Sequence, residues 1–343
     1  MVLVIIADDL TGALDTAAPF AARGLHTQVA LTADAVPAGL LHKPDVLSIN
    51  LASREMSPAD ALRLMLKAVG ALPPDVTLFK KIDSRLKGHV AAELDGIDYR
   101  RALVAPAIPS FGRFVRGGHV EGFGVAKPIS VIDALEHHAV RCDIADALTD
   151  QDLHKALAHA EQERIDLLVG ARGLAEALAV KMTGKEQANL VAPPTGPALF
   201  VIGSHDNITL EQADRMRSLE GLCYRPAPNG VSEPVDLQQM PIVLLQATPG
   251  DTDVAAEKVA QNLALSAHPE LTHAARTLLL CGGATAEAVL SRMGIKCFRL
   301  QGECLPGLGL AYAGEQCIIA KSGGFGEPDT LLTLAKRLLG GRG

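Results

Sequence analysis

The chain has 343 residues, of which 48% are hydrophobic and only 3% are aromatic, and its formal net charge is −7. This length allows two domains of ordinary size, and a composition rich in alanine, leucine and valine favours an α/β protein over a β-sandwich. The negative charge argues against a general nucleic-acid binder, because such proteins gain affinity from basic surface.

The sequence is expected to contain neither a membrane span nor a secretion signal. No apolar run approaches the ~20 residues that a transmembrane helix needs, and the apolar start lacks the basic region of a signal peptide. The six cysteines have neither CxxC spacing nor histidine partners at zinc-like intervals, so free thiols are expected. These features predict a cytoplasmic protein that binds neither nucleic acid nor membrane.

The first element in chain order is an apolar run at residues 2–6 that leads into Asp8 and Asp9. Such a run predicts a parallel strand covered on both faces, and ligands of open α/β sheets collect at the carboxyl ends of their strands. Apolar residues then repeat at helical spacing as far as Ala21, with Asp9 or Thr11 available as the helix cap. From this stretch alone, the two carboxylates form either a site or only a cap and a solvated turn.

Further β-α units follow, with strands expected at residues 27–31, 45–50, 76–82 and 102–105. Arg54 lies just past one of these strand ends, and Lys81 and Asp83 lie at another. Because side chains alternate along a strand, Lys81 and Asp83 share one face. The basic residues around them suit a ligand that carries carboxylate or phosphate. The alternative is a solvated charged loop.

The middle of the chain contains a long segment rich in proline and glycine, residues 106–128, which is expected to be a functional or mobile loop. Helices are expected at residues 130–141, 153–163 and 173–182, with a strand at 165–169. Two histidine pairs, at 137/138 and 154/159, are expected to be surface residues. The polar, proline-rich segment 183–197 is the best domain boundary and predicts domains at residues 1–195 and 196–343.

The second half is also predicted to be α/β, with strands at 198–202, 242–245, 277–280, 296–300 and 316–320 and helices at 208–217, 251–265 and 285–293. Glycine turns follow three of these strands, at 203–204, 281–284 and 323–324. Glycine lets backbone amides approach phosphate oxygens. One such turn is weak evidence, but three favour a phosphate site. Neither the Walker A spacing nor G-x-G-x-x-G is present, which disfavours a P-loop NTPase and a standard dinucleotide domain.

Five motifs together resemble the four-carbon acid sugar kinase family: residues 7–13 (ADDLTGA), 80–84 (KKIDS), 203–204 (GS), 282–283 (GG) and 321–326 (KSGGFG). Members of this family are ATP-dependent kinases of threonate, erythronate and their 2-oxo relatives. The resemblance spans the whole chain. It implies an N-terminal sugar-acid domain, a C-terminal nucleotide domain and phosphoryl transfer in the cleft between them, in a fold of two α/β domains with mainly parallel sheets flanked by helices.

The resemblance also implies which residues form the site. It assigns the substrate to Asp9 with its neighbour Asp8, Arg54, Lys81, Ile82, Asp83 and Ser84, and it assigns ATP to Ser204, Cys281, Gly282, Gly283, Ala284, Gly323 and Gly324. We infer that Arg54 and Lys81 bind the sugar-acid carboxylate, and that Asp9 or Asp83 orients or deprotonates the attacking hydroxyl. Mg²⁺ and the turn amides would stabilise the transferred phosphoryl group. The metal ligands stay unassigned, and no motif supports a homodimer, although one is compatible with the sequence.

Three departures from the family pattern bear on specificity. The family usually has threonine or serine where this chain has Arg85, and an acidic or polar residue where it has Ala284. The chain is also shorter than typical members of the family between Gly118 and Pro193.

One alternative function is a haloacid dehalogenase-type phosphatase, but the register puts Ala7 where its nucleophilic aspartate is needed. The other is a non-catalytic sugar-acid sensor, which absence of ATP binding would favour.

Overall fold

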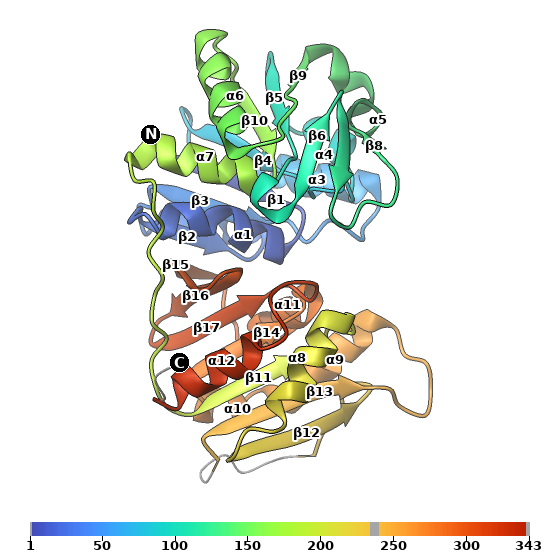
Figure 1. The fold of residues 1–343 in the computed structure, drawn as a ribbon, viewed down its shortest axis with the longest axis vertical. Coiled ribbons are helices and arrows are strands. Elements are labelled where there is room, and N and C mark those ends of the chain that lie inside the picture. Colours follow the sequence, from blue (N-terminus) through green and yellow to red (C-terminus); the bar gives the residue numbers. More distant parts are fainter. Residues whose placement is uncertain (1, 234–239, 341–343) are drawn as a thin grey trace. The chain divides into compact units, whose positions relative to one another are not determined.

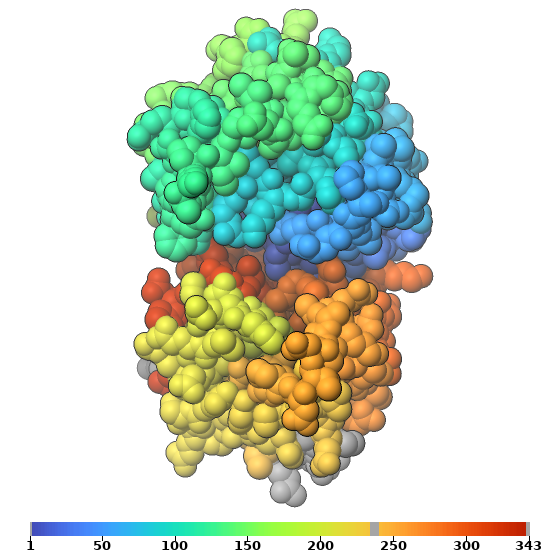
Figure 2. Space-filling model, turned by 90° about the vertical axis from the view of Figure 1, so that its right-hand side faces the viewer, coloured from blue at the N-terminus to red at the C-terminus, as the bar shows by residue number. Residues whose placement is uncertain are grey.

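The computed structural model describes residues 2–233 and 240–340, and the chain divides into two compact units, Met1–Ala188 and Asn189–Gly343. The first unit is coloured blue to green in Figure 1 and the second mainly yellow to red. This division lies a few residues before the boundary that the sequence predicts. Figure 2 shows one face of the molecule as a space-filling view with the same colours.

The N-terminal unit is built on a parallel sheet with the strand order β2-β3-β1-β4-β10-β5-β9. β1 is buried along its whole length, as expected for an apolar strand that is covered on both faces. The strands of this sheet are β1 (Leu3–Ala7), β2 (Thr27–Ala30), β3 (Val46–Asn50), β4 (Thr77–Lys81), β5 (Ala102–Ala105), β9 (Cys142–Ile144) and β10 (Leu167–Gly170).

Helices cover both faces of this sheet. They are α1 (Leu10–Ala21), α2 (Val36–Leu40), α3 (Pro58–Gly70), α4 (Val90–Leu94), α5 (Val131–Leu135), α6 (Asp150–Gln162) and α7 (Arg172–Thr183), with 3-10 helices at Ala33–Ala35, Pro109–Phe111 and Glu136–Arg141. α7 packs against α1 and α6, and α3 packs against α4. α1 connects β1 to β2, and α3 connects β3 to β4 in the opposite direction along the sheet. Because such crossovers are right-handed, α1 and α3 lie on opposite faces of the sheet. The strand order therefore reverses between β1 and β4, which is where open α/β sheets bind ligands.

A small antiparallel sheet replaces most of the long loop that the sequence predicts at residues 106–128. It consists of β6 (Arg113–Arg116), β7 (His119–Gly122) and β8 (Ile129–Ser130), in the order β6-β7-β8. Gly122 has φ +99, and a Cβ atom there would lie 2.2 Å from the carbonyl oxygen of Gly112. A side chain at residue 122 would therefore clash with the backbone of Gly112. The prediction of one long loop is wrong, because Gly117 and Gly118 form a tight turn between two short strands here.

The C-terminal unit has a second sheet, with the order β12-β13-β11-β14-β17-β16-β15. The first five strands of this order are parallel, and β16 is antiparallel to both of its neighbours. The strands are β11 (Ala198–Ile202), β12 (Leu222–Pro228), β13 (Ile242–Thr248), β14 (Thr277–Cys281), β15 (Cys297–Leu305), β16 (Leu308–Ala313) and β17 (Gln316–Lys321). β12 contains Pro226 and Pro228, which an edge strand tolerates.

The helices of this unit are α8 (Asn207–Met216), α9 (Ala256–Ala267), α10 (Glu270–Ala274), α11 (Gly283–Arg292) and α12 (Thr330–Leu338). α8 packs against α12, and α11 packs against α9. The order β12-β13-β11-β14 repeats the order β2-β3-β1-β4 of the first unit, so the direction of the connections again reverses, here between β11 and β14. No helix of the described residues is both long and apolar enough to cross a membrane.

Candidate functional site

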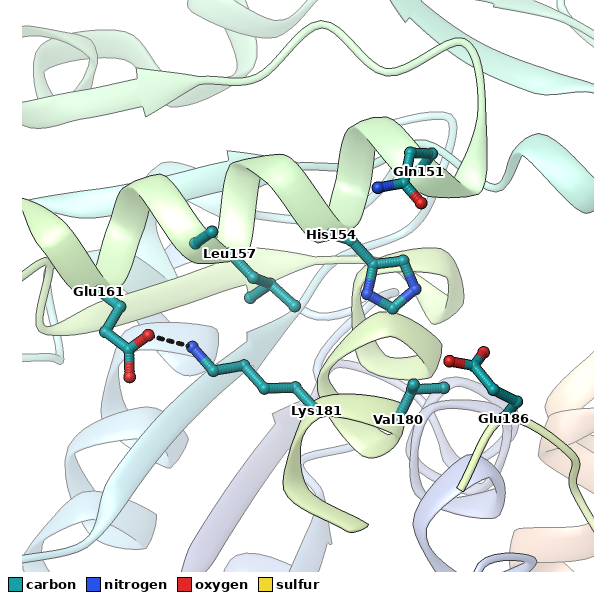
Figure 3. Close-up of a pocket in the computed structure, with 8 residues that line it drawn as sticks. Gln151, His154, Leu157, Glu161, Val180, Lys181 and Glu186 are labelled. Atoms are coloured by element: carbon teal, nitrogen blue, oxygen red, sulfur yellow. Dashed lines mark hydrogen bonds and ion pairs between the residues drawn. The ribbon is translucent and has the colours of Figure 1, made fainter. Parts of the chain in front are cut away.

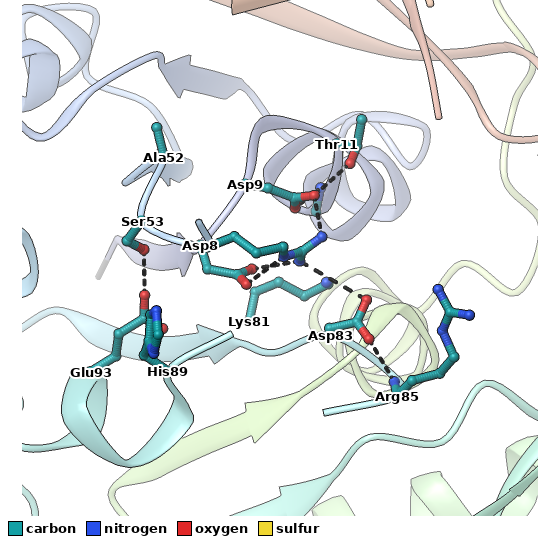
Figure 4. A network of polar contacts seen from close by, with 12 residues as sticks. Asp8, Asp9, Thr11, Ala52, Ser53, Lys81, Asp83, Arg85, His89 and Glu93 are labelled. Carbon is teal, nitrogen blue, oxygen red and sulfur yellow. Dashed lines mark hydrogen bonds and ion pairs between the residues drawn. The ribbon is translucent and has the colours of Figure 1, made fainter. Parts of the chain in front are cut away.

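Three strand ends of the N-terminal unit converge on the guanidinium group of Arg54, which follows β3. Its Nε and Nη2 atoms donate to the two carboxylate oxygens of Asp8 at 2.7 and 2.8 Å, and its Nη1 atom donates to Asp9 at 2.5 Å. Asp83, which follows β4, lies 4.0 Å from Nη2. Figure 4 shows the carboxylates and Lys81 around this point. The residues that the sequence predicts as one substrate site thus lie together.

The electrostatics of this cluster favour its ionised form. Burial raises the pKa of Asp8, but the hydrogen bonds and charge of Arg54, with the charges of Lys80 and Lys81, bring the net pKa below its ordinary value. Burial lowers the pKa of Arg54, but its bonds to Asp8 and the nearby aspartates raise the net value. Asp8 and Arg54 therefore form an ion pair at neutral pH, and most donors of Arg54 are already engaged.

The two aspartates that are predicted as catalytic differ in their engagement. Asp9 caps α1: its Oδ1 atom accepts from the Gly12 amide at 2.7 Å and its Oδ2 atom from the Thr11 hydroxyl at 2.8 Å, in addition to Arg54. Asp83 accepts at Oδ1 from the Arg85 amide at 2.8 Å, whereas the nearest cation to its Oδ2 atom is Arg54 at 4.0 Å. The Oδ2 atom of Asp83 is thus the least engaged carboxylate oxygen of the three residues.

Lys81, at the end of β4, is only 5% exposed. Its ammonium group forms no hydrogen bond or ion pair with any of the described residues. A Cβ atom on Gly12 would lie 3.0 Å from its Nζ atom, so the first turn of α1 approaches it closely only because residue 12 is glycine. Since buried charges are normally paired, Lys81 is suited to an anionic or strongly polar ligand.

The two neighbours of Asp83 differ in what they can offer to a ligand. The Ile82 side chain is 2% exposed and its amide donates to the Gly170 carbonyl at 2.9 Å, so only its carbonyl oxygen is available. The Ser84 hydroxyl accepts from the Nη1 atom of Arg113 at 2.5 Å, which leaves its own proton free to donate.

A buried ion pair beneath the cluster has no signal in the sequence. The Nζ atom of Lys80 lies 2.7 Å from Oε2 of Glu93, and the Ser53 hydroxyl donates to the other Glu93 oxygen at 2.5 Å. All three residues are at most 2% exposed. The Ser53 amide also donates to the Asp8 carbonyl at 2.9 Å. This network fixes the segment that carries Arg54, as the Ser53–Glu93 bond in Figure 4 shows.

In the C-terminal unit, the three glycine turns pack against one another. A Cβ atom on Gly203 would lie 1.9 Å from Oγ1 of Thr285, and one on Gly323 would lie 2.1 Å from Oγ of Ser204. Gly282 has φ +103 and lies against the Ser204 backbone. The turns follow β11, β14 and β17, so they lie at the point where the strand order reverses. The predicted nucleotide residues therefore form one cluster.

This cluster presents groups that suit a phosphate and its metal ion. α11 begins after Gly282 with no side-chain cap, so the amides of its first turn are available to an anion. Asp206, which the sequence analysis does not identify, accepts from the Ile208 amide at 2.9 Å through Oδ1. Its Oδ2 atom faces the Gly324 turn. This carboxylate and the Ser204 hydroxyl are oxygen donors, which fit Mg²⁺.

A buried lysine supports the last of these turns. The Nζ atom of Lys321 donates to the carbonyls of Ser322 and Gly323 at 2.9 and 3.2 Å and to the Thr209 hydroxyl at 3.1 Å. Thr209 in turn donates to the Gly323 carbonyl at 2.5 Å. Burial lowers the pKa of Lys321. These bonds hold the turn in one conformation.

A separate cluster around Asp95 has the spacing of a metal site among the described residues. Asp95 Oδ1 lies 2.9 Å from Nε2 of His137 and 3.1 Å from Nε2 of His138. The Nδ1 atom of His138 faces the Arg141 guanidinium at 2.9 Å, which can only donate. Its Nε2 atom therefore carries the proton and cannot ligate a metal. His138 is fully buried, so its predicted surface position is wrong.

A shallow hollow of 470 Å³ lies along α6 and α7 (Figure 3). It is lined by His154, Lys181 and their neighbours, and Lys181 is paired with Glu161 at 2.8 Å. The hollow is formed by helix side chains rather than by strand ends, and its lysine is already paired. It offers no cluster comparable to the two described above.

Comparison with known families gives two matches. A family described as a sugar-binding N-terminal domain matches residues 3–130, and a family described as a nucleotide-binding C-terminal domain matches residues 231–331. The first match contains the Arg54 cluster, and the second contains the Gly282 and Gly323 turns.

Relatives of known name match nearly the whole chain. A D-threonate kinase from Cupriavidus necator is 31% identical, with 96% of each chain covered. A 3-oxo-tetronate kinase from Burkholderia multivorans is 25% identical, with 94% of each chain covered. The crystal structure of a Haemophilus influenzae protein has the same fold, with a TM-score of 0.73, 20% identity, and coverage of 98% of this chain and 100% of that one.

Proposed function

The chain belongs to the four-carbon acid sugar kinase family, and we propose from this premise that it transfers the γ-phosphoryl group of ATP to a hydroxyl of threonate, erythronate or an oxo-tetronate. The oxo acid in the relative's name is a 3-oxo-tetronate, whereas the resemblance in the sequence analysis implies a 2-oxo acid. Both belong among the candidate substrates. The observation that carries the proposal is the match to a D-threonate kinase across nearly the whole chain.

We assign ATP to the three glycine turns of the C-terminal unit. The amides after Gly282 and in the Gly323–Gly324 turn would bind phosphate oxygens, with Ser204 donating a further hydrogen bond. The assignment covers Cys281 and Ala284 through their backbone only, because Cys281 is fully buried and alanine has no polar side chain. Mg²⁺ held by Asp206, Ser204 and the phosphates would neutralise charge on the transferred group.

We assign the acid substrate to the strand ends of the N-terminal unit. Lys81, which has no partner in the described residues, binds an oxygen of the substrate. Arg54 acts by holding Asp8 and Asp9 in place, since three of its donors are engaged by them. Asp83 is the general base, because its Oδ2 atom is free to accept the proton of the attacking hydroxyl.

The experiment that tests this function is a coupled ADP assay with Mg²⁺ across D- and L-threonate, D- and L-erythronate, and the 2-oxo- and 3-oxo-tetronates. We expect turnover on at least one acid. Absence of turnover on every acid, together with no heat of ADP binding in calorimetry, would refute the kinase proposal.

Two aspartate variants identify the base. Asp83→Asn is expected to lower kcat by about 10²- to 10⁴-fold, because a general base contributes that much. Asp9→Asn is expected to lower kcat less, since asparagine still caps α1. Asp60→Asn, at the exposed start of α3, is the matched control and should leave kcat unchanged. A larger loss in Asp9→Asn than in Asp83→Asn would assign the base to Asp9.

A further inference from the structure

Arg113, the first residue of β6, is a buried cation without a carboxylate partner among the described residues. It is 7% exposed. Its Nε and Nη2 atoms donate to the Phe123 carbonyl at 3.1 and 2.8 Å, and its Nη1 atom donates to the Ser84 hydroxyl at 2.5 Å. Both partners are uncharged, although buried charges are normally paired. One N–H on each terminal nitrogen of Arg113 remains for a ligand.

The small antiparallel sheet fixes the direction of this side chain. Arg113 lies over the Phe111 ring at 5.4 Å, and Phe111 packs edge-on against Phe123 at 5.0 Å. The backbone of Arg113 pairs with Ile108 in both directions, at 2.9 and 3.2 Å. The guanidinium is therefore held in place before any ligand binds, which reduces the entropy lost on binding.

Arg85 brings a second cation to the same place. Its amide donates to Asp83, and its guanidinium, which lies beside Asp83 in Figure 4, forms no hydrogen bond or ion pair with any described residue. Burial, and after it the charge of Arg85, lower the pKa of Arg113. Two neighbouring cations repel each other, and Asp83 supplies a single negative charge beside them. The arrangement thus has a place for one negatively charged group.

We propose that Ser84, Arg85 and Arg113 bind the carboxylate of the sugar acid. This inference rests on the proposed function and names the part of the site that recognises the acid group. It departs from the expectation that Arg54 binds the carboxylate, because Arg54 already faces the carboxylates of Asp8 and Asp9, with Asp83 at 4.0 Å, and a further carboxylate would be repelled there.

The charge balance of the cluster agrees with one bound carboxylate. Four cationic side chains and three carboxylates, Asp83 included, make up this cluster, which leaves one positive charge uncompensated. The cations are Arg54, Lys81, Arg85 and Arg113, and the carboxylates are Asp8, Asp9 and Asp83.

The test compares a sugar acid with its neutral carboxamide. The kcat and KM of the full-length enzyme are measured for the best four-carbon acid and for its amide, in the wild type, Arg85→Gln and Arg113→Lys. Arg116→Gln is the matched control, because Arg116 ends the same strand with a side chain that is 66% exposed. We expect the preference for acid over amide to fall about tenfold in each variant of the subsite, since a hydrogen bond to a charged group has this strength. The control should keep the wild-type preference.

An unchanged acid-to-amide preference in both subsite variants would overturn the inference while leaving the kinase function intact. Arg85→Gln replaces a side chain without hydrogen-bond partners and should keep the native stability, so it decides the question if Arg113→Lys fails to fold. If the wild type phosphorylates no acid, calorimetry with D-threonate decides the subsite, and the proposed function fails if ADP binding is absent as well. Binding that is weakened in Arg85→Gln would support the subsite, and equal binding or no binding would overturn it.

Discussion

Asp8 illustrates how a single residue links stability to pH in this site. Its buried carboxylate accepts two hydrogen bonds from Arg54, and its pKa lies below the ordinary value of 3.8. A carboxyl whose pKa is depressed by folding stabilises the protein above that ordinary pKa and loses this contribution as the pH falls through its folded value. We expect Asp8→Asn to lower the free energy of unfolding by about 2 kcal/mol at neutral pH. Urea denaturation at neutral pH and well below pH 3.8 measures the difference, which should shrink in acid. An equal difference at both pH values would contradict this linkage.

The Lys80–Glu93 pair gives a second prediction for single residues. Glu93→Gln leaves the buried ammonium of Lys80 without its counter-charge, which typically costs about 3–5 kcal/mol. The double variant Lys80→Met/Glu93→Leu removes both charges and is expected to be less destabilised than Glu93→Gln. Urea denaturation of both variants tests this, and a double variant that is as unstable as the single one would show that packing rather than charge dominates there.

The sequence identifies site residues that follow predicted strands. It does not identify residues that reach the site through contacts between distant parts of the chain. Asp8, Asp9 and Asp83 could be proposed because each lies near the end of a predicted strand. Arg113 could not be proposed in the same way, because its contact with Ser84 spans 29 positions and starts from a proline- and glycine-rich segment. The pairing of Lys80 with Glu93 likewise has no local pattern.

At the scale of elements, the close packing of the glycine turns gives a test of the nucleotide site. A Cβ atom on Gly203 would lie 1.9 Å from the Thr285 hydroxyl oxygen, so Gly203→Ala must push the turn after β11 away from α11. We expect Mg·ADP to bind at least about tenfold more weakly, because the amides no longer converge on the phosphates. Calorimetry measures this affinity.

The control for that experiment is Gly70→Ala at the end of α3. A Cβ atom there meets no atom within 4 Å, and Gly70 has no positive φ. Alanine should therefore preserve the native structure and slightly stabilise it. Unchanged Mg·ADP affinity in Gly203→Ala would mean that the turns do not bind the nucleotide in the arrangement proposed here.

The elements that sequence patterns predict well are those whose pattern reflects burial. β5 and β11 have the predicted bounds, and β1 is shifted by one residue. β12 and the β6–β8 sheet were not predicted. β12 carries two prolines, which the edge of a sheet tolerates, and the strands of the small sheet are short and separated by glycine turns. In both places, local composition indicates a loop although tertiary pairing makes a strand.

At the scale of the whole molecule, the two units share a topology that their sequences do not reveal. In each unit, the helix that follows the central strand covers one face of the sheet. The helix that follows a neighbouring strand covers the other face. The strand ends at which the order reverses carry charged side chains in the first unit, around Arg54. In the second unit they carry glycine turns, around Gly282. One arrangement of strands thus supports recognition of an acid in one unit and of phosphates in the other.

Because each unit has its own sheet and buried core, we expect each to fold when expressed alone. In the C-terminal unit the core includes Phe200, Leu244, Leu279 and Leu334, all fully buried, and the three glycine turns belong to the same unit. A fragment of residues 189–343 should therefore unfold cooperatively in urea and bind Mg·ADP within about tenfold of the affinity of the full chain. The same fragment with Gly203→Ala should bind more weakly. A fragment that unfolds cooperatively but binds no nucleotide would show that residues 1–188 contribute to the nucleotide site.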